Sequence, residues 1–133
     1  REELKADEVL ITADTVVCIH DRILGKPADR KEAISMLQKL SGNRHLVVTG
    51  VSVTTRTEQL SFSSRTDVFF KHLSNEEIEF YVDTYKPFDK AGAYGIQEWI
   101  GYIGIERIEG SFYNVMGLPI QKLYETLRKL QFQ

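Results

Sequence analysis

The chain has 133 residues, of which 42% are hydrophobic and 27% charged, so it is neither a disordered nor a collagen-like protein. This length suits about one domain with one hydrophobic core. The formal net charge of -2 and the lack of an apolar run near 18 residues argue against nucleic-acid binding by bulk charge and against a membrane span. The single cysteine, Cys18, excludes an internal disulfide and fits a reducing compartment. We therefore expect a cytoplasmic protein with neither a nucleic-acid nor a membrane partner.

The first half of the chain is predicted to contain strands and one helix. Runs of β-branched and apolar residues indicate strands, whereas apolar residues three or four positions apart after a capping Asp29 indicate a helix. The predicted elements are a buried strand over 9–19 with a break near Ala13-Asp14, a turn over 20–22, a helix over about 30–40, and an antiparallel meander of about three strands over 45–73 with a hairpin turn at 56–59.

The second half is predicted to begin with a helix at Ser74, because Ser74 and Glu77 have the spacing of a capping box. Pro87 ends that helix. The remaining predicted elements are a loop over 88–94, a mixed segment over 96–108 with strand character at 102–105, a loop over 110–118, and a helix over 119–130. Because no linker or repeat interrupts these elements, we predict one α/β domain over residues 1–133.

Asp14 is the first candidate for chemistry. A carboxylate inside an otherwise apolar strand costs free energy unless a metal ion, a cation or a catalytic duty compensates for it. The alternative is a surface aspartate where the strand frays. The residue pattern alone leaves both interpretations open.

Two glycine-containing segments offer cations that could bind phosphate. Lys26 lies on the stiff turn Gly25-Lys26-Pro27, which does not have the spacing of a Walker loop. In the segment 89–97, the glycines allow close backbone approach to a ligand, Lys90 could pair with phosphate, and Gln97 offers a donor and an acceptor to a base edge. Either segment could be a plain surface turn, although the density of small residues beside Asp89 and Lys90 argues against this for 89–97.

Several other constellations are absent or favour a structural role. The three histidines lack metal-ligand spacing, Cys18 has no histidine at a catalytic spacing, and no nucleophile elbow is present. The segment 110–119 could bind an anion at a helix N-terminus, but a helix entry with proline in the first turn is favoured. The candidate site therefore rests on carboxylate, lysine and amide side chains.

Taken together, these segments resemble the Maf (septum-formation inhibitor) family of nucleotide pyrophosphatases. The matching stretches occur in family order and span most of the chain. They are ITADTVV (11–17), ILGKP (23–27), VVTGV (47–51), DKAGAYGIQ (89–97) and IEGSFYNVMGLPI (108–120).

The resemblance implies a fold and a chain context. Family members have a mixed twisted sheet flanked by helices, like that of inosine triphosphate pyrophosphatase. They open with a strand, a Ser-x-Arg-Arg loop that grips the triphosphate, and a helix, none of which precedes the matching motifs here. Because the chain also begins at Arg1 rather than methionine, we expect an N-terminally truncated piece that lacks the first strand–helix unit.

The resemblance also implies an activity and site residues. Members hydrolyse nucleoside triphosphates to the monophosphate and pyrophosphate with a divalent metal, Mg²⁺ or Mn²⁺. Asp14 takes the catalytic role, as general base, metal ligand or both, and Lys26 and, less directly, Lys90 bind phosphate. Thr15 and Gln97 match the branch that acts on dTTP and UTP, although Glu98 stands where the family often has glycine. The alternative is a non-catalytic nucleotide-binding regulator of cell division, and a homodimer is compatible with either.

Overall fold

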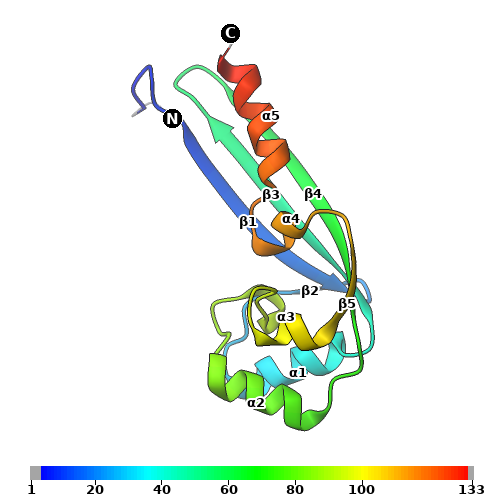
Figure 1. Cartoon of the computed structure of the whole chain (residues 1–133). Coiled ribbons are helices and arrows are strands. Elements are labelled where there is room, and N and C mark those ends of the chain that lie inside the picture. Colours follow the sequence, from blue (N-terminus) through cyan, green and yellow to red (C-terminus); the bar gives the residue numbers. More distant parts are fainter. Residues whose placement is uncertain (1–3, 132–133) are drawn as a thin grey trace.

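The computed structural model describes residues 4–131 and shows an α/β architecture (Figure 1). Five strands form one sheet in the order β2-β1-β3-β4-β5. The strands are β1 (Leu10–Ile19), β2 (Arg22–Leu24), β3 (Arg44–Thr54), β4 (Gln59–Phe70) and β5 (Ile105–Glu109). The helices are α1 (Arg30–Leu40), α2 (Asn75–Tyr85), a short 3₁₀ turn η1 (Ala91–Ala93), α3 (Trp99–Gly104), α4 (Phe112–Met116) and α5 (Ile120–Gln131). None of these helices within residues 4–131 has the length and apolar character to cross a membrane.

The α/β class predicted from the sequence is confirmed, with one difference in the sheet. All pairings among the described strands are antiparallel, where a mixed sheet was expected. Short turns connect the strands in two of these pairings, β1 with β2 and β3 with β4. His20 and Asp21 turn the chain with positive φ angles of 48° and 62°, which matches the twist of a two-residue β-hairpin and confirms the predicted turn.

Strands β3 and β4 form one long hairpin rather than the predicted meander of three strands. Their register runs without a break from Arg44 opposite Phe69 to Thr54 opposite Gln59. Gly50 lies inside β3 and does not interrupt it, which is why two strands replace three. The hairpin turn predicted at 56–59 is confirmed.

The hydrophobic core is divided between the two ends of this hairpin. In the main cluster, α1, α2 and the 91–100 region pack against one end of the sheet, with Leu37, Ile78, Tyr81 and Ile100 almost fully buried. A smaller cluster forms where α5 lies along the far end of β3 and β4 (Figure 1); its buried members are Val51, Val53 and Leu123. The candidate site described below lies at the part of the sheet between these two clusters.

The caps predicted for two helices are confirmed. The Asp29 side chain accepts a hydrogen bond from the Glu32 amide at 2.8 Å, and Ser74 and Glu77 form a complete capping box. Arg30 and Asp83 then join α1 to α2 through a 2.7 Å contact. The capping contacts of Asp29 and of Ser74 with Glu77 are local, so they do not depend on the rest of the fold.

Three predictions for local structure were wrong. Strand β1 is unbroken, and its first half is exposed because residues 10–16 pair only with β3 within the described chain. Residues 102–104 belong to α3 rather than to a strand. A Cβ atom on Gly101 would overlap the Ile96 carbonyl, so glycine is what lets this short helix lie so close to the preceding segment. The predicted loop at 110–118 contains α4.

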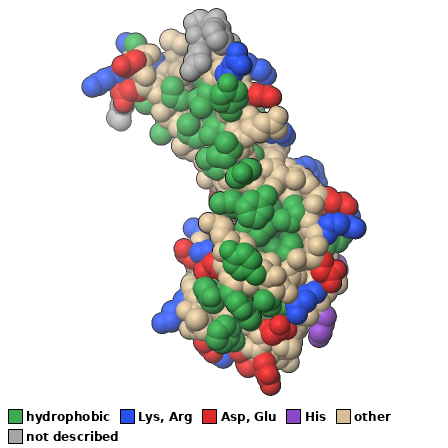
Figure 2. Space-filling model, viewed as in Figure 1, with side chains coloured by type: hydrophobic (Ala, Val, Ile, Leu, Met, Phe, Trp, Pro, Cys, Tyr) green, Lys and Arg blue, Asp and Glu red, His purple; other side chains and the backbone are tan. Residues whose placement is uncertain are grey.

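Exposed apolar side chains gather on α4 and α5. Tyr113 and Tyr124 are more than half exposed, and Phe112, Met116 and Ile120 are also exposed. Figure 2 shows hydrophobic side chains spread over this face of the molecule. Through Met116, this apolar face reaches the cavity that holds the candidate site.

Candidate active site

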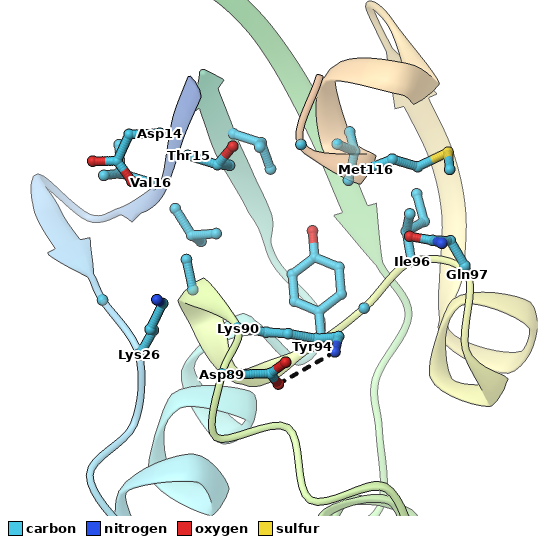
Figure 3. Close-up of a pocket in the computed structure, with 17 residues that line it drawn as sticks. Asp14, Thr15, Val16, Lys26, Asp89, Lys90, Tyr94, Ile96, Gln97 and Met116 are labelled. Carbon is cyan, nitrogen blue, oxygen red and sulfur yellow. Dashed lines mark hydrogen bonds and ion pairs between the residues drawn. The ribbon is translucent and has the colours of Figure 1, made fainter. Parts of the chain in front are cut away.

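A cavity of about 500 Å³ brings together the five site residues named from the sequence (Figure 3). Its lining comes from β1, the turn after β2, β3, the segment 89–97 and the end of α4. The five residues are Asp14, Thr15, Lys26, Lys90 and Gln97. Side chains separated by up to 83 positions therefore meet at one site.

Charged and amide side chains occupy different parts of this cavity. Asp14 and Lys26 lie on one side, Gln97 and Met116 on the opposite side, and Tyr94 between them (Figure 3). Asp14 is exposed in an intact strand, paired opposite Gly50, so it is neither a buried carboxylate nor a residue at a frayed end. Its position on the cavity wall, rather than a cost of burial, makes it a candidate for chemistry.

Glycine backbone joins the two lysine-bearing segments. The Gly92 amide donates to the Gly25 carbonyl at 3.1 Å, which places Lys26 beside the 89–97 segment. Gly92 has a φ of 70°, and a Cβ atom there would lie 3.1 Å from the Val17 side chain. The sequence predicted a close approach to a ligand; at Gly92 the close approach is made instead to Val17 of the sheet, where a larger residue would be strained.

Lys90 lies between two carboxylates. Its Nζ is 3.3 Å from Asp89 Oδ1 and 3.9 Å from Glu98 Oε1. The hydrogen bond from Lys90 holds the pKa of Asp89 below its usual range. The Tyr81 hydroxyl donates to Glu98 at 2.7 Å and accepts from the Gly95 amide at 3.0 Å. Glu98 thereby helps to position Lys90 and the loop backbone.

Thr15 is held by a buried polar network that the sequence analysis missed. Thr15 Oγ1 and Thr49 Oγ1 share a 2.8 Å hydrogen bond, and Thr49 in turn donates to the Asn114 carbonyl at 3.3 Å. The side-chain nitrogen of the fully buried Asn114 carries two hydrogens and has three acceptors within reach, the carbonyls of Val47 and Ser64 and the Thr66 hydroxyl. No spacing in a single sequence distinguishes such an asparagine. The segment 110–119 therefore has the favoured structural role and also supplies part of the cavity wall.

Tyr94 lines the cavity and had no role assigned from the sequence. It is 6% exposed, and its hydroxyl lies 2.6 Å from Nε2 of His45, which is 2% exposed. The Phe70 ring stacks on His45 and meets Tyr94 edge-on. Burial lowers the pKa of His45 to about 4, so the ring is neutral at physiological pH.

His45 is expected to make the fold sensitive to acid. Its pKa is lower in the folded chain than the ordinary value of 6.5, so its stabilising contribution is complete above pH 6.5 and is lost as the pH falls towards 4. Between pH 7 and pH 5, this group should lower the free energy of unfolding by about 2 kcal/mol. Urea unfolding at both pH values measures the change. In His45→Gln this pH-dependent part of the free energy of unfolding should be missing. An equal decrease in the free energy of unfolding of both proteins would show that His45 is not its source.

The cavity has few side chains that could bind a divalent metal. Within residues 4–131, no group of three or more His, Cys, Asp or Glu side chains could hold a metal alone. Asp14 and Asp89 do line the cavity. Mg²⁺ is usually bound by one or two carboxylates together with substrate phosphates, so this donor set fits a metal that arrives with a nucleotide.

Comparison with known proteins identifies the family of this chain. The family model described as Maf-like protein matches residues 1–130. A dTTP/UTP pyrophosphatase of Bacteroides thetaiotaomicron is 58% identical over 130 residues, which is 98% of this chain and 67% of the relative. A dTTP/UTP pyrophosphatase of Porphyromonas gingivalis is 62% identical over 120 residues, covering 90% of this chain and 60% of the relative.

A third relative extends the comparison to lower identity. The dTTP/UTP pyrophosphatase of Christiangramia forsetii is 49% identical over 128 residues, 96% of this chain and 65% of its own length. The chain thus spans about two thirds of the length of the curated relatives it matches. The match over nearly the whole chain confirms the resemblance stated from the motifs: this chain belongs to the Maf-like protein family.

Proposed function

We propose that the protein hydrolyses dTTP and UTP to the monophosphate and pyrophosphate. The observation that carries this proposal is the convergence of two carboxylates, two ammonium groups and an amide on a single cavity of about 500 Å³. Such a volume is typical of small-molecule sites. The names of the similar proteins, dTTP/UTP pyrophosphatases, support the choice of substrate.

In this reaction, a water oxygen bonds to phosphorus and the bridging bond between the α- and β-phosphates breaks. Asp14 accepts the proton that the water loses, a contribution worth roughly 10²- to 10⁴-fold in rate. Lys26 and Lys90 offset the negative charge that develops on the departing pyrophosphate. Lys90 can turn from its carboxylate neighbours to a phosphate, because its contacts with Asp89 and Glu98 are long.

The cofactor in this proposal is Mg²⁺ or Mn²⁺, which Asp14 would hold together with phosphate oxygens. When bound, such an ion neutralises phosphate charge and makes water more acidic. Asp89 lines the same cavity and is the second carboxylate available to it.

Base recognition is assigned to the other side of the cavity. Gln97 carries a donor and an acceptor on one amide, which matches the mixed edge of uracil or thymine. Thr15 is oriented by its 2.8 Å bond to Thr49. A site that hydrogen-bonds its substrate discriminates strongly, because a mismatched base would leave these polar groups unpaired.

The test is pyrophosphate release across dTTP, UTP, CTP, GTP and 7-methyl-GTP, with Mg²⁺ and with Mn²⁺. The protein should be expressed from the full reading frame that encodes this chain. Metal-dependent release from dTTP and UTP supports the proposal. Nucleotide binding without release would instead favour the non-catalytic regulator. Light scattering on the same sample decides whether the protein is a homodimer.

Lys26→Ala should lower kcat/KM for UTP by about 10- to 100-fold, the worth of one charge-assisted contact to phosphate. Lys31→Ala is the matched control, since Lys31 is an exposed lysine on α1 outside the cavity. Steady-state kinetics of both variants measure the effect. If both variants keep the parental kcat/KM, Lys26 has no place in the site.

The site of action is assigned to the cytoplasm, where nucleotide pools are held. The single cysteine agrees with a reducing compartment. Fractionation of cells that express the full reading frame tests this assignment.

A further inference from the structure

Tyr94 and His45 form a buried polar pair that the proposed reaction does not use. The pair joins β3 to the 89–97 segment, and its two polar atoms are 2.6 Å apart. Burying polar groups costs free energy, and an apolar pair of similar size would pack here without that cost. The hydroxyl of Tyr94 belongs to a residue that lines the cavity, so a ligand there is a possible partner for it.

The surroundings of His45 decide which atom donates in this pair. His45 Nδ1 is buried and has no hydrogen-bond partner within the described residues. A hydrogen on Nδ1 would therefore be an orphaned N–H group, which is rare in folded proteins. With the hydrogen on Nε2 instead, His45 donates to the Tyr94 oxygen. The phenol hydrogen is then free to be donated elsewhere.

The cavity is where that hydrogen can be donated. Within residues 4–131, the Tyr94 hydroxyl has no hydrogen-bond partner apart from His45. Figure 3 shows the hydroxyl pointing into the space between Thr15 and Met116, away from the ammonium group of Lys90. Thr15 and Gln97 are the residues assigned to base recognition. The donor therefore faces the part of the cavity assigned to the base rather than to the phosphates.

We propose that the Tyr94 hydroxyl donates a hydrogen bond to a carbonyl oxygen of the pyrimidine base, and that His45 is the positioning residue that orients it. This inference rests on the proposed function for the identity of the ligand. Uracil and thymine share two carbonyl oxygens on the ring edge, so one fixed donor serves both bases. A fixed donor complements the Gln97 amide, which is exposed and less constrained.

The first test separates base binding from phosphate binding. Tyr94→Phe removes the hydroxyl and keeps the ring against Phe70. Affinities for UMP and for pyrophosphate are measured by calorimetry, with Tyr102→Phe as the control, because Tyr102 is 82% exposed on α3. In Tyr94→Phe, UMP should bind about 3- to 10-fold more weakly while pyrophosphate binds as before. An equal loss for both ligands, or no loss for UMP, overturns the proposal.

The second test concerns His45. His45→Gln keeps an N–H donor at this position, whereas His45→Leu removes it. His45→Gln should retain the UMP affinity of the parent protein, whereas His45→Leu should bind UMP as weakly as Tyr94→Phe does. The double variant that combines His45→Leu with Tyr94→Phe should bind UMP no more weakly than either single variant. Additive losses in the double variant would show independent roles and overturn the pairing. Unfolding midpoints identify variants whose fold has changed. If a variant does not fold, the position of the hydrogen on the His45 ring of the parent protein, measured by NMR as described next, tests the proposal instead.

Nitrogen NMR of the His45 ring provides a readout that does not depend on turnover. Hydrogen on Nε2 and a bare Nδ1 are expected, and UMP should shift these signals more than pyrophosphate does. Hydrogen on Nδ1 would overturn the proposal. A parent protein that binds UMP with these signatures but releases no pyrophosphate would refute the proposed function and leave this inference standing.

Discussion

Asp14→Asn is expected to lower the turnover of dTTP and UTP by about 10²- to 10⁴-fold and to leave the fold intact. Asparagine has nearly the same shape as aspartate but cannot accept the proton of the attacking water. Asp14 is exposed in a paired strand, and no hydrogen bond of its side chain stabilises the described fold. Pyrophosphate release measures turnover, and the unfolding midpoint reports on the fold.

The control for this prediction is Asp21→Asn. Asp21 is another exposed aspartate near β1, and its φ of 62° is one that asparagine also adopts readily. This variant should retain full turnover. Near-normal turnover in Asp14→Asn would remove Asp14 from both the base and the metal-ligand roles.

Asn114→Ala is expected to lower the free energy of unfolding by about 3 kcal/mol. The substitution removes an amide nitrogen that has three acceptors within hydrogen-bond distance, and it leaves the carbonyls of Val47 and Ser64 with fewer partners in a buried site. It also loosens the tie between α4 and the sheet. Thr49 donates a hydrogen bond to the backbone carbonyl of Asn114 and is bonded to Thr15. Thr15 should therefore become less ordered when α4 is held less firmly.

Urea unfolding of Asn114→Ala and of Asn75→Ala measures this effect. Asn75 is exposed at the start of α2, so its substitution should change stability by about 0.5 kcal/mol or less. A loss of discrimination between UTP and CTP is expected in Asn114→Ala at temperatures where the variant remains folded. Equal stability of the two variants would show that the Asn114 network contributes little.

Local signals account for the parts of the fold that were predicted well. Asp29 and the pair Ser74 and Glu77 cap helices through contacts made within three residues of chain. The turn at 20–22 likewise depends on residues next to each other. Signals of this range are complete in the sequence, so the boundaries of α1 and α2 could be predicted from it.

Segments governed by distant contacts were predicted less well. α3 has only six residues, too few for a helical period to stand out from its β-branched isoleucines. The position of α3 depends on the close approach of Gly101 to Ile96, which cannot be inferred from the strand-like composition of this segment. The exposure of the first half of β1 likewise depends on which elements cover it, not on its own composition.

For the candidate site, all five residues could be named from the sequence, four of them from residue type and motif and Thr15 from the resemblance to the family. Asp14, Thr15, Lys26, Lys90 and Gln97 were all named without coordinates. That they share one cavity, and which groups hold them there, follows from the folded arrangement of the chain. Residues such as Tyr94, His45, Asn114 and Glu98 act through hydrogen bonds between segments far apart in the chain. Such bonds form only when packing brings their atoms within about 3 Å, and no spacing along a single sequence encodes that distance.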